Sequence, residues 1–199
     1  GLPHWNELKH LVRYVAGTRQ YGILFGKNSY PLHAKLQHDL SGPLECFVDS
    51  DHAADKDTRR SCTGYVFFSR GGPISWRSRL QNSTALSTTE AEFMAASDAG
   101  CENAWLRRLL GELTNIPCTR LNGFLVPKDI SAPKLSQKFY DNEVPTKFNE
   151  DNQGCIKVSI NPVLHGRMKH IDIKYHRLKE FVANGDCFLH YVPTDRQIA

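Results

Sequence analysis

The sequence predicts an α/β fold, a mixed β-sheet flanked by helices, and three observations support this prediction. β-forming residues alternate in part over 44–51, 63–69 and 74–80, with a Gly-Gly-Pro turn before the third segment. The longest regular stretch follows over 87–113 and has a helical pattern. Strand and helix patterns then alternate again, so the element order β-β-β-α-β-α-α-β favours a sheet covered by helices.

Composition restricts the class of protein. The 199 residues are enough for one domain with an appendage. Hydrophobic residues make up 40% and charged residues 23%, which argues against a disordered, fibrous or coiled-coil chain. The net charge of +4 is compatible with a polyanionic partner. No apolar run approaches the ~20 residues needed to cross a bilayer and no signal peptide is recognisable, so we expect an intracellular protein without a membrane partner.

The N-terminal part of the chain reads as an appendage. Apolar residues recur at helical spacing over 5–15, which predicts a helix, and the composition of 21–25 suits a strand. Residues 28–43 hold turn-forming residues and show no clear period. We therefore place a linker there and begin the main unit at residue 44.

The long helix begins with a recognisable cap. Ser87 and Glu90 form the S-x-x-E pattern of a capping box. The helix is rich in small residues, which let a helix lie close to a sheet. These are Ala91, Ala95, Ala96, Ala99, Gly100 and Ala104.

The second half of the chain begins with an irregular segment. Residues 114–148 contain four prolines, so we predict an insertion or long loop there. A short strand runs into 149–151 and is followed by predicted helices over 152–160 and 170–183. An alternating pattern over 187–193 predicts the last strand.

Three acidic residues stand where strands end or where the long helix begins. Asp49 closes the first strand of the main unit, Glu92 lies in the first turns of the helix, and Asp151 ends the short strand. Carboxylates gathered at one sheet edge repel one another unless a cation relieves them. Two Mg²⁺ or Mn²⁺ ions about 4 Å apart can activate a water and stabilise the leaving oxygen of a phosphodiester. Taken singly, each acid is better explained as a cap or a solvated surface charge.

Neighbouring acids compete for two of these positions. Glu90 and Glu92 are about 200° apart around a helix, so only one can face the sheet edge. We assign Glu90 to the capping box and Glu92, which shares a side with Ala96, to the chemistry. Asp51 shares a face with Asp49 if the strand continues, and would then lie behind the direct ligand.

Longer motifs carry a family resemblance. The segments are FVDSDHAAD, RRSCTGYVFFSRGGPISWRSRLQNSTALSTTEAEFMAAS, AWLRRLL, EDNQGCIKVSINPVLHGRMKHIDIKYHRLKE and HYVPTDRQIA. They resemble the ribonuclease H domain of copia-type LTR-retrotransposon polyproteins. HWNELKHLVRYVAGTRQYGILF resembles the tail of the upstream reverse transcriptase region. On this resemblance, 1–43 is a reverse-transcriptase tail and linker, and 44–199 is an RNase H-like domain with an insertion at 114–148.

The resemblance implies an RNase H-like fold with a five-stranded mixed sheet. It further implies an endonuclease that hydrolyses the RNA strand of RNA–DNA hybrids with two Mg²⁺ or Mn²⁺ ions, bound by a D-E-D-D set of carboxylates. By position, Asp49, Glu92 and Asp151 match the first three as catalytic residues and metal ligands. The implied partners are an RNA–DNA hybrid and the rest of a retrotransposon polyprotein, including its reverse transcriptase, and the implied location is cytoplasmic.

The chain departs from the family pattern in three places. The fourth Asp of the family follows a Gln-x-Ala, whereas here that motif is 197–199 and ends the chain, and Asp195 fits a helix cap better than a ligand. The insertion at 114–148 is longer than usual, and Asn149 and Glu150 are more polar than a buried central strand should be. The alternative function is therefore a catalytically inactive module, derived from a retroelement, that binds nucleic acid or a protein partner.

Arginines gather on and around the predicted hairpin. A phosphate-tracking surface and an ordinary solvated face explain them about equally well, and the resemblance favours the first. The 2′-OH groups of the RNA strand would help to distinguish a hybrid from duplex DNA. The residues concerned are Arg59, Arg60, Arg70, Trp76, Arg77 and Arg79.

Cysteine and histidine spacing argues against a zinc site. The six cysteines include no C-x-x-C pair, so we expect free thiols in a reducing compartment. His165, His170 and His176 have no cysteine pair beside them, and the family motif KHIDIKYH accounts for two of them.

Overall fold

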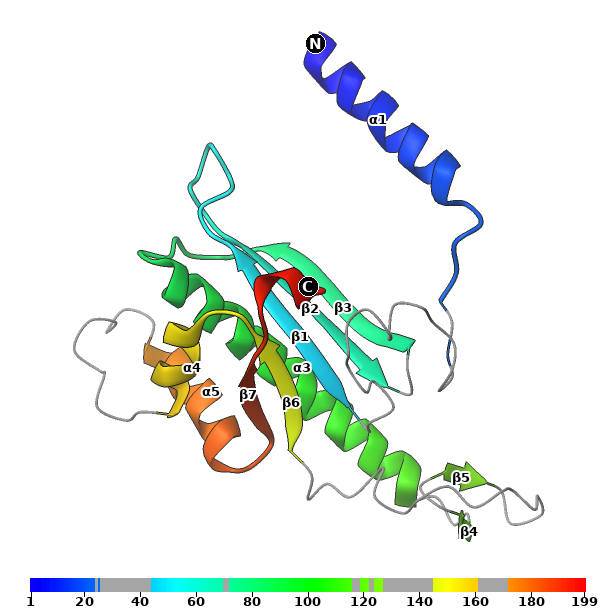
Figure 1. Ribbon diagram of the computed structural model, residues 1–199, viewed down its shortest axis with the longest axis vertical. Coiled ribbons are helices and arrows are strands. Elements are labelled where there is room, and N and C mark those ends of the chain that lie inside the picture. Colours follow the sequence, from blue (N-terminus) through cyan, green and yellow to red (C-terminus); the bar gives the residue numbers. More distant parts are fainter. Residues whose placement is uncertain are drawn as a thin grey trace.

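A five-stranded sheet, built from both halves of the sequence, organises the chain (Figure 1). We describe residues 1–23, 25, 44–69, 72–115, 119–121, 124–126, 145–160 and 172–199 of a computed structural model. Their elements in order are α1 (Leu2–Thr18), β1 (Glu45–Asp51), β2 (Cys62–Ser69), β3 (Gly72–Leu80), α3 (Thr88–Asn115), β4 (Thr119–Leu121), β5 (Phe124–Val126), β6 (Thr146–Glu150), α4 (Gln153–Ile160), α5 (Asp172–Ala183), β7 (Cys187–Tyr191) and a short 3-10 helix (Thr194–Arg196).

The strand order of the sheet is β3-β2-β1-β6-β7. β1, β2 and β3 pair antiparallel, whereas β1 runs parallel to β6, and β6 to β7. This arrangement confirms the predicted α/β class and the five-stranded mixed sheet that the resemblance implied. Because β1 and β6 are parallel neighbours, their carboxyl ends meet at one edge of the sheet. That edge is where Asp49 and Asp151 lie.

The capping box that the sequence predicts starts α3. The N–H of Glu90 donates to Oγ of Ser87 at 3.2 Å, and the N–H of Leu86 donates to Oε2 of Glu90 at 3.0 Å. The small side chains of the helix then allow close packing on the sheet, as predicted, because no long side chain separates the two layers. Four of these residues are completely buried in the main core: Ala91, Ala95, Ala96 and Ala99.

The two faces of the sheet are covered differently. On one face, α3, α4 and α5 share the main core with strand residues such as Cys46 and Phe148, and Figure 1 shows α3 running behind the sheet. On the other face, Phe47 and Phe68 form a small cluster against which Ile198 packs. The C-terminal segment therefore covers part of the face opposite α3.

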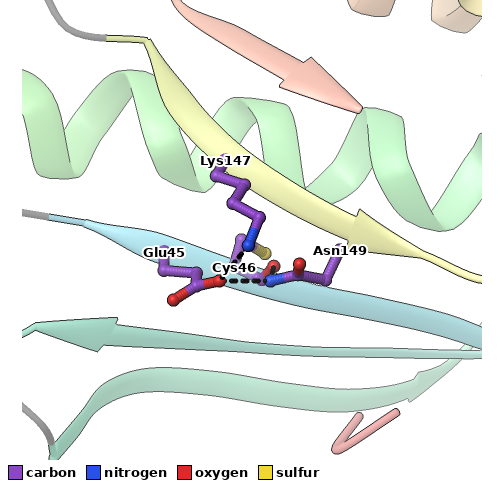
Figure 2. Close-up of polar contacts among 4 residues, drawn as sticks. All are labelled: Glu45, Cys46, Lys147 and Asn149. Atoms are coloured by element: carbon purple, nitrogen blue, oxygen red, sulfur yellow. Dashed lines mark hydrogen bonds and ion pairs between the residues drawn. The ribbon is translucent and has the colours of Figure 1, made fainter. Parts of the chain in front are cut away.

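Polar residues in β6 are accommodated by partners on β1. Asn149 and Glu150 are both completely buried. Asn149 Nδ2 donates to Oε1 of Glu45 at 2.8 Å and to the carbonyl of Cys46 at 3.1 Å, and Lys147 pairs with the same Glu45 oxygen at 3.0 Å (Figure 2). These bonds satisfy the donor groups of Asn149 and Lys147, whereas Oδ1 of Asn149 and Oε2 of Glu150 are buried without a hydrogen-bond partner among the described residues.

Three local predictions were wrong. Residues 21–23 and 25 form no strand, and no described strand pairs with them. β4 and β5 pair antiparallel inside 114–148, which was predicted to be irregular. The overlooked signal is the Asn-Gly dipeptide of TRLNGFLV, which lies between β-forming residues and favours a two-residue hairpin turn. Asp195, expected to fit a helix cap, instead lies inside the single 3-10 turn Thr194–Arg196, which follows Pro193 as its N-cap.

The helix α1 has an apolar side that the described structure leaves exposed. None of its residues is buried, although Trp5, Leu11 and Val15 recur at helical spacing. The linker predicted over 28–43 lies outside the described residues, so the domain boundary stays a prediction. Every helix in the described part of the chain is too short or too polar to cross a lipid bilayer.

Gly100 permits the close contact between α3 and α5. A Cβ on Gly100 would lie 2.5 Å from Cδ2 of Phe181, so alanine forces the ring or the helix to move. We expect Gly100→Ala to lower the free energy of unfolding in urea by about 1–3 kcal/mol, as overpacking does. Adding Phe181→Leu should restore part of the loss. Gly64→Ala is the control because a Cβ there meets nothing closer than 3.7 Å, and an equal loss at both glycines would contradict this explanation.

Candidate metal centre

Three carboxylates from separate parts of the chain meet at one edge of the sheet. One oxygen atom from each of Asp49, Glu92 and Asp151 lies within 4.8 Å of the other two. Asp49 lies in β1, Glu92 lies near the start of α3, and Asp151 directly follows β6. The structure thus brings together the three acids that the sequence singled out. Their roles as catalytic residues and ligands stay a prediction.

Local structure explains how each acid reaches the cluster. Asp49 is placed by the pairing of β1 with β2, and Oδ2 of Asp151 accepts a hydrogen bond from Oγ1 of Thr194 at 2.6 Å. Glu92 lies on the buried side of α3, whereas the carboxylate of Glu90 is occupied by the helix cap. Because these two residues point in different directions around the helix, Glu90 takes part in the cap and Glu92 joins the acid cluster, as expected.

Burial and mutual repulsion oppose ionisation in this cluster. Glu92 is only 6% exposed. Burial first, and then the negative charges of Glu150, Asp49 and Asp151, raise the pKa of Glu92 to about 10. Burial also raises the pKa of Asp49. Oε2 of Glu92 is buried and has no hydrogen-bond partner among the described residues, so this carboxyl group has an oxygen left for a ligand.

Glu150 is a further acid beside the cluster and, unlike the half-buried Asp49 and Asp151, is completely buried; the sequence did not assign it a role. Its Oε1 accepts the backbone N–H of Asn152 at 3.0 Å. Burial raises the pKa of Glu150 to about 8, the hydrogen bond from Asn152 opposes the shift, and the charges of Asp151 and Asp49 add to it. In the sequence this residue was visible only as a polar one at the end of a strand.

The donor set suits a hard divalent cation. Its members are carboxylate oxygens, which Mg²⁺ and Mn²⁺ prefer over nitrogen or sulfur ligands. The buried Glu92 oxygen without a partner, and the raised pKa of Glu92, show a site with more negative charge than its own residues neutralise. Asp49, Glu92 and Asp151 would hold such a cation, and its charge would favour their ionised forms.

Asn152 connects the start of α4 to the start of α3. Its Oδ1 caps α4 by accepting a backbone N–H at 3.0 Å, and Oγ1 of Thr89 donates to the same oxygen at 3.4 Å. A Cβ on Gly154 would lie 2.7 Å from Oγ1 of Thr89, so the two helix starts are in close contact. This junction helps to set the position of Asp151 relative to Glu92.

The predicted nucleic-acid-binding residues of β3 lie on two faces of the sheet. Arg77 is opposite Tyr65 and Trp76 is opposite Val66, so Trp76 points away from the side that carries Arg77 and Arg79. The two arginines line a surface pocket of about 220 Å³ beside α3. Trp76 is 62% exposed on the opposite face. The arginines and the tryptophan therefore do not form one continuous surface on a single face of the strand.

The other predicted arginines belong to the loop between β1 and β2. Arg59 is exposed and has a φ of 55°, and the guanidinium of Arg60 donates to the carbonyl of Gln81 at 3.5 Å. Arg70 lies outside the described residues. The nucleic-acid-binding role of all these residues stays a prediction.

Five of the six cysteines lie in the described part of the chain, and none of these five forms a disulfide. Cys46, Cys62, Cys101, Cys155 and Cys187 are free. His165 and His170 lie outside the described residues. Within the described part of the chain, the acid cluster is the one group of potential ligands that could hold a metal ion.

Comparisons with known proteins place the chain among transposon polyproteins. No family model matches. The chain is 38% identical over 182 residues to the retrovirus-related Pol polyprotein from transposon TNT 1-94 of Nicotiana tabacum, which covers 92% of the chain and 11% of that protein. It is 33% identical over 197 residues to the Pol polyprotein from transposon RE2 of Arabidopsis thaliana, covering 98% of the chain and 11% of the relative. The chain thus spans about a tenth of either relative's length.

Two solved structures of RNase H1 also resemble the chain. The enzyme of Halobacterium salinarum is 14% identical and covers 77% of this chain and 90% of its own, with a TM-score of 0.42. LC11-RNase H1 in complex with an RNA/DNA hybrid is 11% identical and covers 77% of this chain and 88% of its own, also with a TM-score of 0.42.

The metal-free protein should lose stability as the pH rises. Glu92 and Glu150 have folded pKa values of about 10 and about 8, against an ordinary value of 4.5. Above pH 4.5 these groups ionise in the unfolded chain but stay protonated in the folded chain. Their contribution to the free energy of unfolding is therefore fully present below pH 4.5 and is lost as the pH rises to the folded pKa values. Each group that is protonated only in the folded state contributes about 1.4 kcal/mol per pH unit, so we expect urea unfolding in EDTA to show a loss of about 1–3 kcal/mol for each pH unit between pH 5.5 and 8.

A matched pair of variants identifies the source of this pH dependence. Glu92→Gln cannot ionise, so it should reduce the dependence to the part that Glu150 contributes and stabilise the metal-free protein at pH 8. Asp57→Asn, at an exposed position in the loop after β1, should leave the dependence unchanged. A stability of the unaltered chain that stays level or increases from pH 5.5 to 8 would contradict the electrostatic description of the cluster.

Proposed function

Because the chain has its homologues among the retrovirus-related Pol polyproteins of plant transposons, we propose that it is a ribonuclease H-type domain that hydrolyses the RNA strand of RNA–DNA hybrids. The observation that carries this proposal is the convergence of Asp49, Glu92 and Asp151, whose oxygens lie within 4.8 Å of one another. These residues come from three elements far apart in the sequence, and the fold brings them to one sheet edge.

Asp49, Glu92 and Asp151 would hold two Mg²⁺ or Mn²⁺ ions. When bound, such ions supply an activated water for attack on the phosphodiester and stabilise the leaving oxygen. The contribution of the chain is to hold the carboxyl groups together despite their repulsion. Glu92, whose pKa is about 10, carries a proton in the metal-free site and would release it as the site is loaded.

Arg77 and Arg79 would contact the phosphates of the hybrid. Both line the pocket beside α3, the helix that also carries Glu92. Phosphate contacts position a strand without reading its bases, which suits an enzyme that acts on many sequences. The 2′-OH groups of the RNA strand would provide the distinction from duplex DNA.

The surroundings of the domain are also part of the proposal. Relatives that match the chain are long polyproteins, of which the chain spans 11%. We infer that the domain acts beside a reverse transcriptase of such a polyprotein, and in the cytoplasm. The alternative is a module that binds nucleic acid or a protein without cleaving it.

Hybrid cleavage decides between these two functions. We expect the chain to cleave the RNA strand of a labelled RNA–DNA hybrid in Mg²⁺ or Mn²⁺, and Asp49→Asn to reduce the rate at least about 100-fold by removing a metal ligand. Asp57→Asn removes an exposed acid outside the cluster and should cleave normally. Equal cleavage by the unaltered chain and Asp49→Asn would refute the assigned site, and hybrid binding without cleavage would support the alternative.

The pocket arginines should contribute to hybrid affinity rather than to chemistry. We expect Arg77→Ala or Arg79→Ala to weaken hybrid binding and to reduce the slope of log K against log salt by about 1, as the loss of one phosphate contact does. Fluorescence anisotropy at several salt concentrations measures both effects. Arg108→Ala removes an exposed arginine from α3 and is the charge-matched control. The same slope in all four proteins would refute the phosphate contacts.

A further inference from the structure

Gln81 connects the two elements that carry Asp49 and Glu92. It follows β3 directly and is only 3% exposed. Its Nε2 donates to the carbonyl of Ala91 at 2.9 Å and to Oγ1 of Thr63 at 3.0 Å, and lies 3.4 Å from Oγ of Ser50. One side-chain amide group thus touches α3 and both strands of the first hairpin.

The partners of this amide are the neighbours of the proposed metal ligands. Ala91 immediately precedes Glu92, and Ser50 immediately follows Asp49. Thr63 stands directly opposite Ser50 in the pairing of β1 with β2. Gln81 therefore bonds to the backbone of α3 one residue before Glu92, and to hydroxyl side chains of β1 and β2 beside Asp49.

The backbone of Gln81 is itself anchored. Its N–H donates to the carbonyl of Ser61 at 2.8 Å, and its carbonyl accepts from Arg60 at 3.5 Å. Oγ of Ser61 in turn accepts the N–H of Ala53 in the loop after β1 at 3.1 Å. A side chain attached to a fixed backbone can hold its partners in place, which a side chain on a mobile loop cannot do.

All side-chain hydrogen bonds described for Gln81 are donated by its Nε2 atom. Oε1 is buried and has no hydrogen-bond partner among the described residues. A buried acceptor without a partner is unfavourable, so an apolar residue would fill this space with less cost. The carbonyl of Ala91 lies inside α3, where the helical ladder already engages it, so the bond from Gln81 is not needed to complete the helix.

We propose that Gln81 is a positioning residue of the metal centre, whose side-chain amide holds Asp49 and Glu92 at the separation that a divalent ion requires. This inference rests on the proposed function, because it assigns the clamp to that same site. Partners behind the direct ligands commonly change metal affinity by about 10- to 100-fold when they are lost.

The test compares the buried side-chain amides of Gln81, which contacts the start of α3, and Asn103, which lies further along the same helix. Gln81→Met keeps the volume and removes the donor. Asn103→Leu is the matched control, because Asn103 is also completely buried, also has an oxygen without a partner, and donates to the carbonyl of Asp186 at 3.1 Å, away from the cluster. Thr63→Val removes one acceptor of the Gln81 side chain and replaces Gln81→Met as the test variant if Gln81→Met does not fold.

Calorimetric titration with Mn²⁺ gives the deciding measurement. We expect Gln81→Met to raise the Kd for Mn²⁺ about 10-fold or more and Thr63→Val to raise it less, whereas Asn103→Leu stays within about 2-fold of the unaltered chain. Hybrid cleavage by Gln81→Met should recover as Mn²⁺ is increased, which a loss of folded protein would not produce. An unchanged Kd in Gln81→Met, or an equal rise in Asn103→Leu, would overturn the proposal.

A second measurement separates this proposal from the proposed function. If the unaltered chain binds no Mn²⁺ and cleaves no hybrid, the proposed function fails. Hydrogen exchange of the metal-free proteins then tests the clamp alone. Faster exchange over 88–95 in Gln81→Met, with unchanged exchange over 101–106, supports the clamp. Unchanged exchange over 88–95 refutes it.

Discussion

Repulsion among buried carboxyl groups is the constraint on which the rest of the structure depends. Asp49, Glu92 and Asp151 meet at one edge of the sheet with the buried Glu150 beside them, and burial weakens the hydration that would stabilise the charges of Glu92 and Glu150. Glu92 responds by keeping its proton to high pH. Such a cluster destabilises a protein that has no cation to bind, and it becomes favourable when a cation is present. The cluster is therefore compatible with binding a divalent cation, which the proposed function requires.

The scaffold around the cluster is held together by polar side chains between elements. Asn149 links β6 to Glu45 on β1 inside the sheet (Figure 2), and Asn152 joins the starts of α3 and α4. Gln81 joins α3 to the first hairpin. Directional hydrogen bonds fix relative position more tightly than apolar contacts, which allow sliding. Strands and helices that bring carboxyl groups close together need such hydrogen bonds between them, because the repulsion between the charges pushes these elements apart.

The sequence predicted the parts of this arrangement that follow from local rules. Asp49 and Asp151 could be placed because strand ends are recognisable, and Glu92 could be separated from Glu90 by the angle between helical positions. The burial of Glu150 depends on which elements cover the end of β6, which no local pattern reveals. Trp76 and Arg77 point in opposite directions because successive side chains of a strand alternate between its faces. The prediction of a single surface containing both residues overlooked this alternation. The role of Gln81 depends on contacts across three elements, so the sequence showed only a polar residue after a strand.

The most direct test of the central claim is to locate a bound metal ion. Crystals of the chain soaked in Mn²⁺ give an anomalous scattering signal at the position of each ordered ion. The account predicts anomalous peaks between the carboxyl groups of Asp49, Glu92 and Asp151, and no such peaks in crystals of Asp49→Asn. Crystals at saturating Mn²⁺ with an empty cluster, or with ions bound only at other positions, would contradict it.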